Sequence, residues 1–349
     1  MHPRTDLELL KESLSDLAHT PYFNRALEEH TQALLAVVDH VLSASPSYDD
    51  EIVRQLVDKV WTTHRYLEGS TTKESPYEIE YCLRFAISEW LARDCIVTTA
   101  LTEEKDFHLR IGDPWDFVET TLDRYESELP QSRLIFIGVP RLYKSLPLFC
   151  CALYHELGHF VDQMGEITET SLLISPIDAS MPEKFHPTME SYRREHFADL
   201  FAACYVGSAI ADCLDALNPD AGMTLTHPPT QQRIDLIRSF LAGETSQELE
   251  FYQDALKRRG LPELKCRFDV PPIEPAFDDI RPHVLEGIEQ LHGIFPAGWS
   301  YLAKSIHGSG AAWSVGATRL EIIRIVNDLA EKSIRNASLR QLWALNHDS

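Results

Sequence analysis

Apolar residues recur every three or four positions through most of the chain, which is the spacing of one face of an α-helix. The pattern is clear over residues 7–17 and returns over residues 26–42 and 52–66, so we expect a helical region over residues 1–130. Residues 133–140 differ, because they are rich in β-branched and aromatic side chains and lie between prolines, which predicts a strand. The expected fold class is mainly α (α+β), with a small edge sheet.

The second half of the chain alternates helical patterns with loops. Apolar residues at helical spacing predict helices over residues 145–164, 188–217 and 230–241. Residues 165–187 are looser and hold three prolines, as in a long loop that covers a cleft. Proline also concentrates in residues 260–282, which predicts a linker.

These patterns predict four regions along the chain. We expect a helical N-terminal region at residues 1–130, a core at residues 131–259, a Pro-rich linker at residues 260–282 and a helical C-terminal region at residues 283–349.

Charge and composition narrow the classes of partner. The 349 residues include 32 Lys and Arg against 54 Asp and Glu, a formal net charge of −22. Such a field repels phosphate, so we expect no nucleic-acid partner and no binding to anionic lipid. No apolar run approaches the roughly 20 residues of a membrane span, and the N-terminus does not resemble a signal peptide. The seven cysteines form no CxxC pair, which favours reduced thiols and a cytoplasmic location.

One segment carries specific chemistry. Residues 155–159 read H-E-x-x-H inside an otherwise apolar predicted helix. Residues four apart lie on the same face of a helix, so His155 and His159 can direct ring nitrogens at one metal ion. Glu156 can then act as a general base on a water molecule. Burying these polar groups without an ion would be costly, which favours metal binding over a purely structural histidine pair.

A zinc hydrolase needs a third protein ligand, and the downstream sequence offers candidates. The metzincin continuation is excluded, because Asp162 and Gly165 occupy the positions that its pattern requires to be Gly and His. Glu195 is the favoured third ligand. Asp199, four residues later, can accept a hydrogen bond from a ligand histidine. The alternative third ligands are His196, Asp199 itself and His186.

A third motif surrounds His227. It precedes Pro228 and Pro229 at the start of the predicted helix over residues 230–241. Its imidazole can donate a hydrogen bond to the oxyanion of a tetrahedral intermediate. The same sequence also suits a simple helix-entry turn, and its presence beside the other two motifs favours the functional interpretation.

These motifs together resemble gluzincin-type zinc metallopeptidases. The H-E-x-x-H segment and Glu195-x-x-Ala198-Asp199 are similar to ImmA/IrrE-like peptidases. The stretch from T-H-P-P at His227 to Arg233-Ile234 is similar to the T-H-P-P…R-I signature of CaaX-processing and HtpX-like peptidases. The resemblance implies a zincin-like helical core in which Glu195 completes the zinc site, Asp199 supports a ligand histidine and His227 faces the substrate.

The resemblance also implies that a strand lies along a bound peptide. Residues 133–139 are the candidate, which would make Ile135 and Ile137 substrate-binding residues, and Tyr192 could assist His227 at the oxyanion.

We therefore expect a zinc-dependent metalloendopeptidase that binds one Zn²⁺ per chain and hydrolyses a peptide bond in a cytosolic protein, with Glu156 as general base. Two alternatives stay open. One is a catalytically silent zinc-binding regulatory or interaction protein that binds a protein partner through its N- or C-terminal helices, although a purely structural site does not need Glu156. The other is a zinc hydrolase that acts on something other than a peptide.

Overall fold

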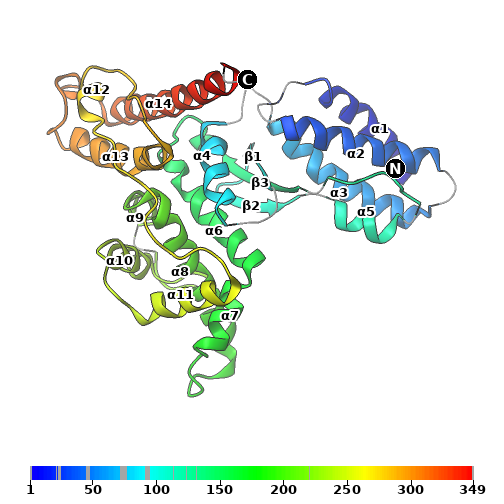
Figure 1. The fold of residues 1–349 in the computed structure, drawn as a ribbon, viewed down its shortest axis with the longest axis horizontal. Coiled ribbons are helices and arrows are strands. Elements are labelled where there is room, and N and C mark those ends of the chain that lie inside the picture. Colours follow the sequence, from blue (N-terminus) through cyan, green and yellow to red (C-terminus); the bar gives the residue numbers. More distant parts are fainter. Residues whose placement is uncertain are drawn as a thin grey trace. The chain divides into compact units, whose positions relative to one another are not determined.

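A computed structural model describes residues 2–347 apart from residues 21, 23, 24, 45–47, 71–76, 91–94, 113, 123, 131 and 220. The chain is mainly helical with one small three-stranded sheet, which confirms the predicted fold class (Figure 1). The chain divides into two compact units. The first comprises residues 1–80 and 91–144, and the second comprises residues 81–90 and 145–349. This division groups residues by spatial contact, and the four regions expected from the sequence stay a prediction.

The first unit begins with the three expected helices, α1 (Pro3–Leu17), α2 (Arg25–Ser43) and α3 (Asp50–Gly69). Each has an apolar stripe, and α1 packs against both α2 and α3. Asp49 caps α3, because its side chain accepts a hydrogen bond from the backbone N–H of Ile52 at 2.9 Å.

The sheet contains two strands that the sequence analysis assigned to helix. They are β1 (Cys95–Thr102) and β2 (His108–Ile111), and α5 (Trp115–Thr121) follows them. The helical prediction was wrong here. The β-branched run over residues 96–99 favours an extended chain, and pairing with a distant strand secures it.

The predicted strand is confirmed as β3 (Arg133–Pro140), but the prediction that it forms an exposed edge was wrong. The order is β1-β3-β2, with β3 parallel to β1 and antiparallel to β2. Ile135 and Ile137 therefore have strand partners on both sides, and their side chains are fully buried. A peptide cannot add to a strand whose two edges are already paired.

Helices dominate the second unit. Its first element, α4 (Tyr77–Ser88), starts within the first unit's range. The longer helices that follow are α6 (Ala152–Gly165), α7 (Ile167–Ile174), α8 (His186–Val206), α9 (Ala209–Leu217), α10 (Thr230–Leu241), α11 (Gln247–Arg259), α13 (Ile288–Ile306) and α14 (Arg319–His347). The shorter ones are α12 (Glu274–Asp278) and the 3₁₀ turns at Phe149–Cys151, Glu183–Phe185 and Ala312–Ser314, whereas the 3₁₀ turn at Arg141–Tyr143 belongs to the first unit.

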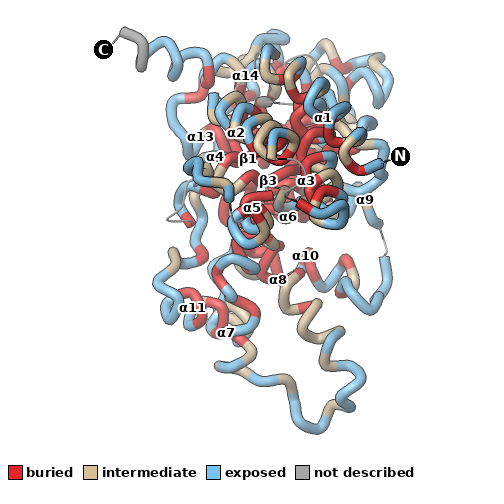
Figure 2. The backbone as a smooth tube through the Cα atoms, turned by 90° about the vertical axis from the view of Figure 1, so that its right-hand side faces the viewer, coloured by how far each residue is buried: buried red, intermediate tan, exposed pale blue. Residues whose placement is uncertain are grey.

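Helix α8 is the centre of the second unit. Every residue from Glu195 to Val206 is buried, and the tube along this part of α8 is red in Figure 2, so this part of the helix is covered on all sides and not on one face as expected. Helices α6, α7, α9, α10 and α13 all pack against it. A helix that is buried all round is typical of the core of a large unit.

Helix α6 approaches α8 at Gly158. A Cβ atom at this position would lie 2.8 Å from the Cα atom of Ala198. Gly158 lies between His155 and His159, and Ala198 precedes Asp199, so the close contact joins the two motifs.

Several boundaries differ from the sequence expectations. The supposed loop over residues 165–187 contains α7 and a 3₁₀ turn, and α7 packs against α11, which the sequence pattern did not reveal (Figure 1). The helix expected over residues 188–217 breaks at Gly207, where φ is +53°. Helix α10 has the predicted bounds. Among the residues described, no helix has the length and apolar character that a membrane crossing requires.

Candidate metal centre

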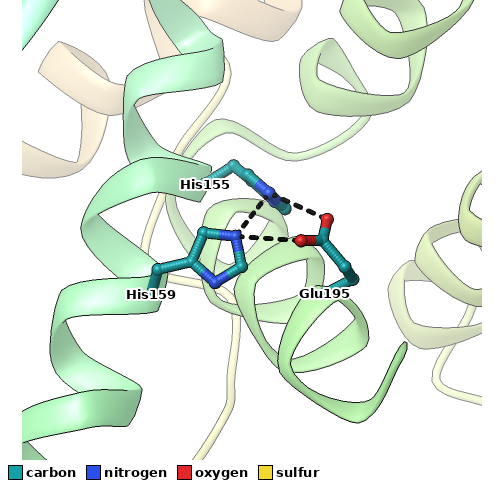
Figure 3. A group of neighbouring side chains, drawn as sticks. All are labelled: His155, His159 and Glu195. Carbon is teal, nitrogen blue, oxygen red and sulfur yellow. Dashed lines mark hydrogen bonds and ion pairs between the residues drawn. The ribbon is translucent and has the colours of Figure 1, made fainter. Parts of the chain in front are cut away.

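The first two motifs meet where α6 packs against α8. His155 and His159 project from α6 and Glu195 projects from α8, and the three side chains point toward one another (Figure 3). The Nε2 atoms of His155 and His159 lie 3.0 Å apart. Glu195 contacts both rings, with Oε2 3.3 Å from His155 Nε2 and Oε1 3.3 Å from His159 Nε2.

These separations fit a single metal ion. Two ligands of a tetrahedral zinc ion, each about 2.0–2.1 Å from it, lie about 3.3–3.4 Å apart. The three observed separations of 3.0, 3.3 and 3.3 Å are close to that value. Oε2 of Glu195 is buried and accepts no hydrogen bond from the residues that the structure describes. The group could therefore hold a metal ion, with two imidazole nitrogens and a carboxylate as donors.

Asp199 fixes the orientation of His155. Its Oδ1 lies 2.9 Å from His155 Nδ1, so Nδ1–H donates to the carboxylate while Nε2 faces the other ligands. Burial lowers the pKa of His155, but the hydrogen bond and the charge of Asp199 outweigh burial and raise this pKa to about 10. Such a carboxylate–histidine pair holds the ring and increases its basicity as a ligand.

Arg233, on α10, is the site residue whose part the sequence analysis missed. Its Nε and Nη2 atoms donate to Oδ2 and Oδ1 of Asp199, both at 2.7 Å. Nη2 also lies 3.4 Å from Glu195 Oε2 and 3.4 Å from each ring nitrogen of His155. The sequence analysis quoted Arg233 only as the end of the third motif and gave it no role, although it lies within the apolar face of α10, beside Ile234 and Ile237.

The two carboxylates of the site are held ionised. Burial raises the pKa of Asp199, but the charge and hydrogen bonds of Arg233 lower it to about 2. Burial likewise raises the pKa of Glu195, whereas its contacts with His155 and His159 bring that pKa well below the usual range. An ionised Glu195 is the form that can bind a cation.

The alternative third ligands have other partners. His196, next to Glu195, turns to α11, where its Nδ1 lies 3.5 Å from Glu248 Oε1. His186 Nε2 lies 3.3 Å from the carbonyl oxygen of Met181. Asp199 is engaged by Arg233 and His155.

The third motif also reaches the group. His227 Nε2 lies 3.5 Å from Glu195 Oε1, and the His227 side chain is 54% exposed. Residues 221–229, which carry it, are tied to α8. The Tyr192 hydroxyl donates to the carbonyl oxygen of Thr224 at 2.6 Å, and the Ser191 hydroxyl donates to that of Thr226 at 2.9 Å. Tyr192 therefore holds the segment that carries His227.

One side of the group is open to solvent. The His159 side chain is 30% exposed, Glu156 is half-buried and His227 is exposed. Burial lowers the pKa of the Arg233 guanidinium, but Asp199 and, to a lesser degree, the charges of Glu195 and Glu156 outweigh burial and raise this pKa. A water molecule or a substrate atom could thus reach an ion held by the three ligands.

The predicted substrate residues Ile135 and Ile137 belong to the first unit, whereas the metal group lies in the second. Comparison with protein-family models, curated proteins and solved structures finds no match to this chain.

Proposed function

We propose that the protein is a zinc-dependent metalloendopeptidase of the gluzincin type. The observation that supports this most strongly is the set of near-tetrahedral separations among His155, His159 and Glu195. Three protein ligands with an open side are typical of catalytic zinc sites, whereas structural sites close with a fourth protein ligand. Glu156 follows the first ligand directly and is half-buried beside that group.

Zinc is favoured over other divalent ions by the motif. Two histidines and one carboxylate also form the facial triad of non-haem iron proteins. An H-E-x-x-H helix adds a general base to the ligands, which is the arrangement that zinc hydrolysis uses. A bound zinc ion would lower the pKa of a water molecule and polarise the scissile carbonyl.

The chain's own residues would act around that chemistry. Glu156 accepts a proton from the attacking water and passes it to the leaving amine. His227 donates a hydrogen bond to the oxyanion from the open side of the group. Asp199 keeps the Nδ1–H of His155 occupied, so that Nε2 stays available to the ion.

Metal analysis and a hydrolysis assay test the proposal. Mass spectrometry of the purified wild type should find one zinc per chain, and Glu195→Ala should lose it. Glu156→Gln should keep the zinc and lose hydrolysis in a screen of peptide and protein substrates.

Three results would contradict the proposal. They are a wild type that binds no metal, one that selects iron over zinc, and a Glu156→Gln variant that retains hydrolysis. A wild type that binds zinc but cleaves nothing would favour the silent zinc-binding interaction protein.

A further inference from the structure

We propose that Arg233 is a positioning residue that sets the metal affinity of the site by holding the carboxylate of Asp199 in one orientation. This inference rests on the proposed metal site and concerns a residue that contacts none of the reacting atoms. Arg233 acts through Asp199, which in turn orients His155.

The Arg233–Asp199 pair has the geometry of a rigid clamp. Two parallel hydrogen bonds of 2.7 Å join the guanidinium to both carboxylate oxygens. The Arg233 side chain is 8% exposed and that of Asp199 is fully buried. A planar two-bond pair of this kind fixes direction as well as distance, and a lysine cannot reproduce it.

The clamp determines the position of Asp199 Oδ1 and therefore of its contact with His155 Nδ1. Oδ1 receives hydrogen bonds from both Arg233 Nη2 and His155 Nδ1, at 2.7 and 2.9 Å. If the carboxylate rotates, this shared position is lost and the His155 ring is free to turn. Metal–ligand distances in proteins lie within about ±0.2 Å of their usual values, so we expect a modest rotation of the ring to weaken binding.

Electrostatics alone predicts the opposite result. The Arg233 cation lies 3.4 Å from Glu195 Oε2, close to where the metal would sit, and it repels a divalent ion. On charge alone, removal of this cation strengthens metal binding and a lysine in its place changes nothing. Loss of a residue that orients a ligand typically costs 10–100-fold in metal affinity. The two explanations therefore differ in sign.

The experiment measures the zinc dissociation constant by competition with a chromophoric chelator at fixed pH. Arg233→Lys keeps the charge and loses the clamp, and Arg233→Met loses both. We expect both variants to bind zinc about 10–100-fold more weakly than the wild type. Arg238→Met is the matched control, because Arg238 is exposed on the same helix, and its affinity should equal that of the wild type.

A double variant tests whether Arg233 acts through Asp199. Asp199→Asn should weaken zinc binding, and adding Arg233→Met to it should weaken binding little further, because the clamp is already lost. The imidazole NMR spectrum of the zinc-bound protein supplies a second measurement. The Nδ1–H signal of His155 should be protected from exchange in the wild type and lost in Arg233→Met.

The outcomes separate this inference from the proposed function. A wild type without zinc affinity overturns the proposed function. A wild type that binds zinc, with Arg233→Lys unchanged and Arg233→Met tighter, overturns only the role of Arg233. Thermal melting of the metal-free variants shows whether each is folded. If the losses of zinc-binding free energy in Asp199→Asn and Arg233→Met add fully in the double variant, the inference is also overturned, because Arg233 would then act independently of Asp199.

Discussion

Replacement of Gly158 by alanine should separate the two helices that carry His155, His159 and Glu195, the proposed metal ligands. The added Cβ atom would lie 2.8 Å from Cα, 3.1 Å from the carbonyl oxygen and 3.2 Å from Cβ of Ala198. Two of these atoms belong to the backbone of α8 and cannot turn aside as the end of a side chain can. The helices must therefore move apart, and Glu195 moves with α8.

The size of the effect follows from these distances. Ordinary carbon contacts begin near 3.4 Å, so relief of the shortest contact requires a shift of about 3.4 − 2.8 = 0.6 Å. This exceeds the tolerance of about ±0.2 Å for metal–ligand distances. Overpacking costs about 1–3 kcal/mol, and the better helix propensity of alanine offsets about 1 kcal/mol of it. A free-energy change of about 1.4 kcal/mol corresponds to a factor of ten in affinity. Strain of about 1–3 kcal/mol in the metal-bound state should therefore weaken zinc binding about 5–140-fold.

Chelator competition measures the zinc affinity, and thermal melting without metal shows that the variant is folded. Gly165→Ala, at the end of the same helix, is the control. Its Cβ would lie 2.7 Å from Cδ1 of Leu261, a side-chain end that can move, so its zinc affinity should stay close to that of the wild type. A folded Gly158→Ala that binds zinc as tightly as the wild type would refute the reasoning.

Three further predictions concern the same unit. Tyr192→Phe removes the hydrogen bond to Thr224 and loosens the segment that carries His227. We expect unchanged zinc binding but a several-fold lower kcat, because one hydrogen bond contributes about 1 kcal/mol. An unchanged kcat would contradict this prediction. Burial raises the pKa of Asp162 from 3.8 to about 6, although hydrogen bonds from Thr168 oppose this. The stabilising contribution of Asp162 is therefore complete below pH 3.8 and lost as the pH rises through 6. We expect the free energy of unfolding of the wild type, relative to that of Asp162→Asn, to fall by up to about 3 kcal/mol between pH 4 and pH 7, as measured by chemical denaturation. Parallel pH profiles of the two proteins would contradict this. Zinc removal by a chelator should lower the stability of the wild type by about 4 kcal/mol if free zinc had been 1,000 times its Kd, and Glu195→Ala should not respond.

Local patterns were sufficient for the elements whose bounds the sequence predicted. Strand β3 and helix α10 have the expected residues, because each combines a strong periodic or β-branched pattern with proline, on both sides of β3 and just before the start of α10. The proposed metal ligands were predictable for the same reason. His155 and His159 lie one turn apart on α6, and Glu195 and Asp199 lie one turn apart on α8.

Features that depend on distant partners were not accessible. Nothing within residues 133–140 shows that β1 and β2 pair with both edges of β3, so the edge position was predicted wrongly. The role of Arg233 was hidden likewise, because its meaning comes from Asp199, which lies 34 residues away in the chain. Helix α7 was taken for loop since its eight residues are short for a periodic pattern.

The contact of Gly158 with Ala198 explains why a pair of polar residues on α6 and a pair on α8 form one site. Each helix carries two polar residues one turn apart. Because the helices pack closely, the two pairs face each other and His155 contacts both Glu195 and Asp199. The buried carboxylates would repel each other in this space without Arg233 and the histidines between them. Helix packing, charge balance and ligand geometry are thus set by the same few contacts. It follows that zinc affinity and the stability of the α6–α8 packing should change together across variants in this contact.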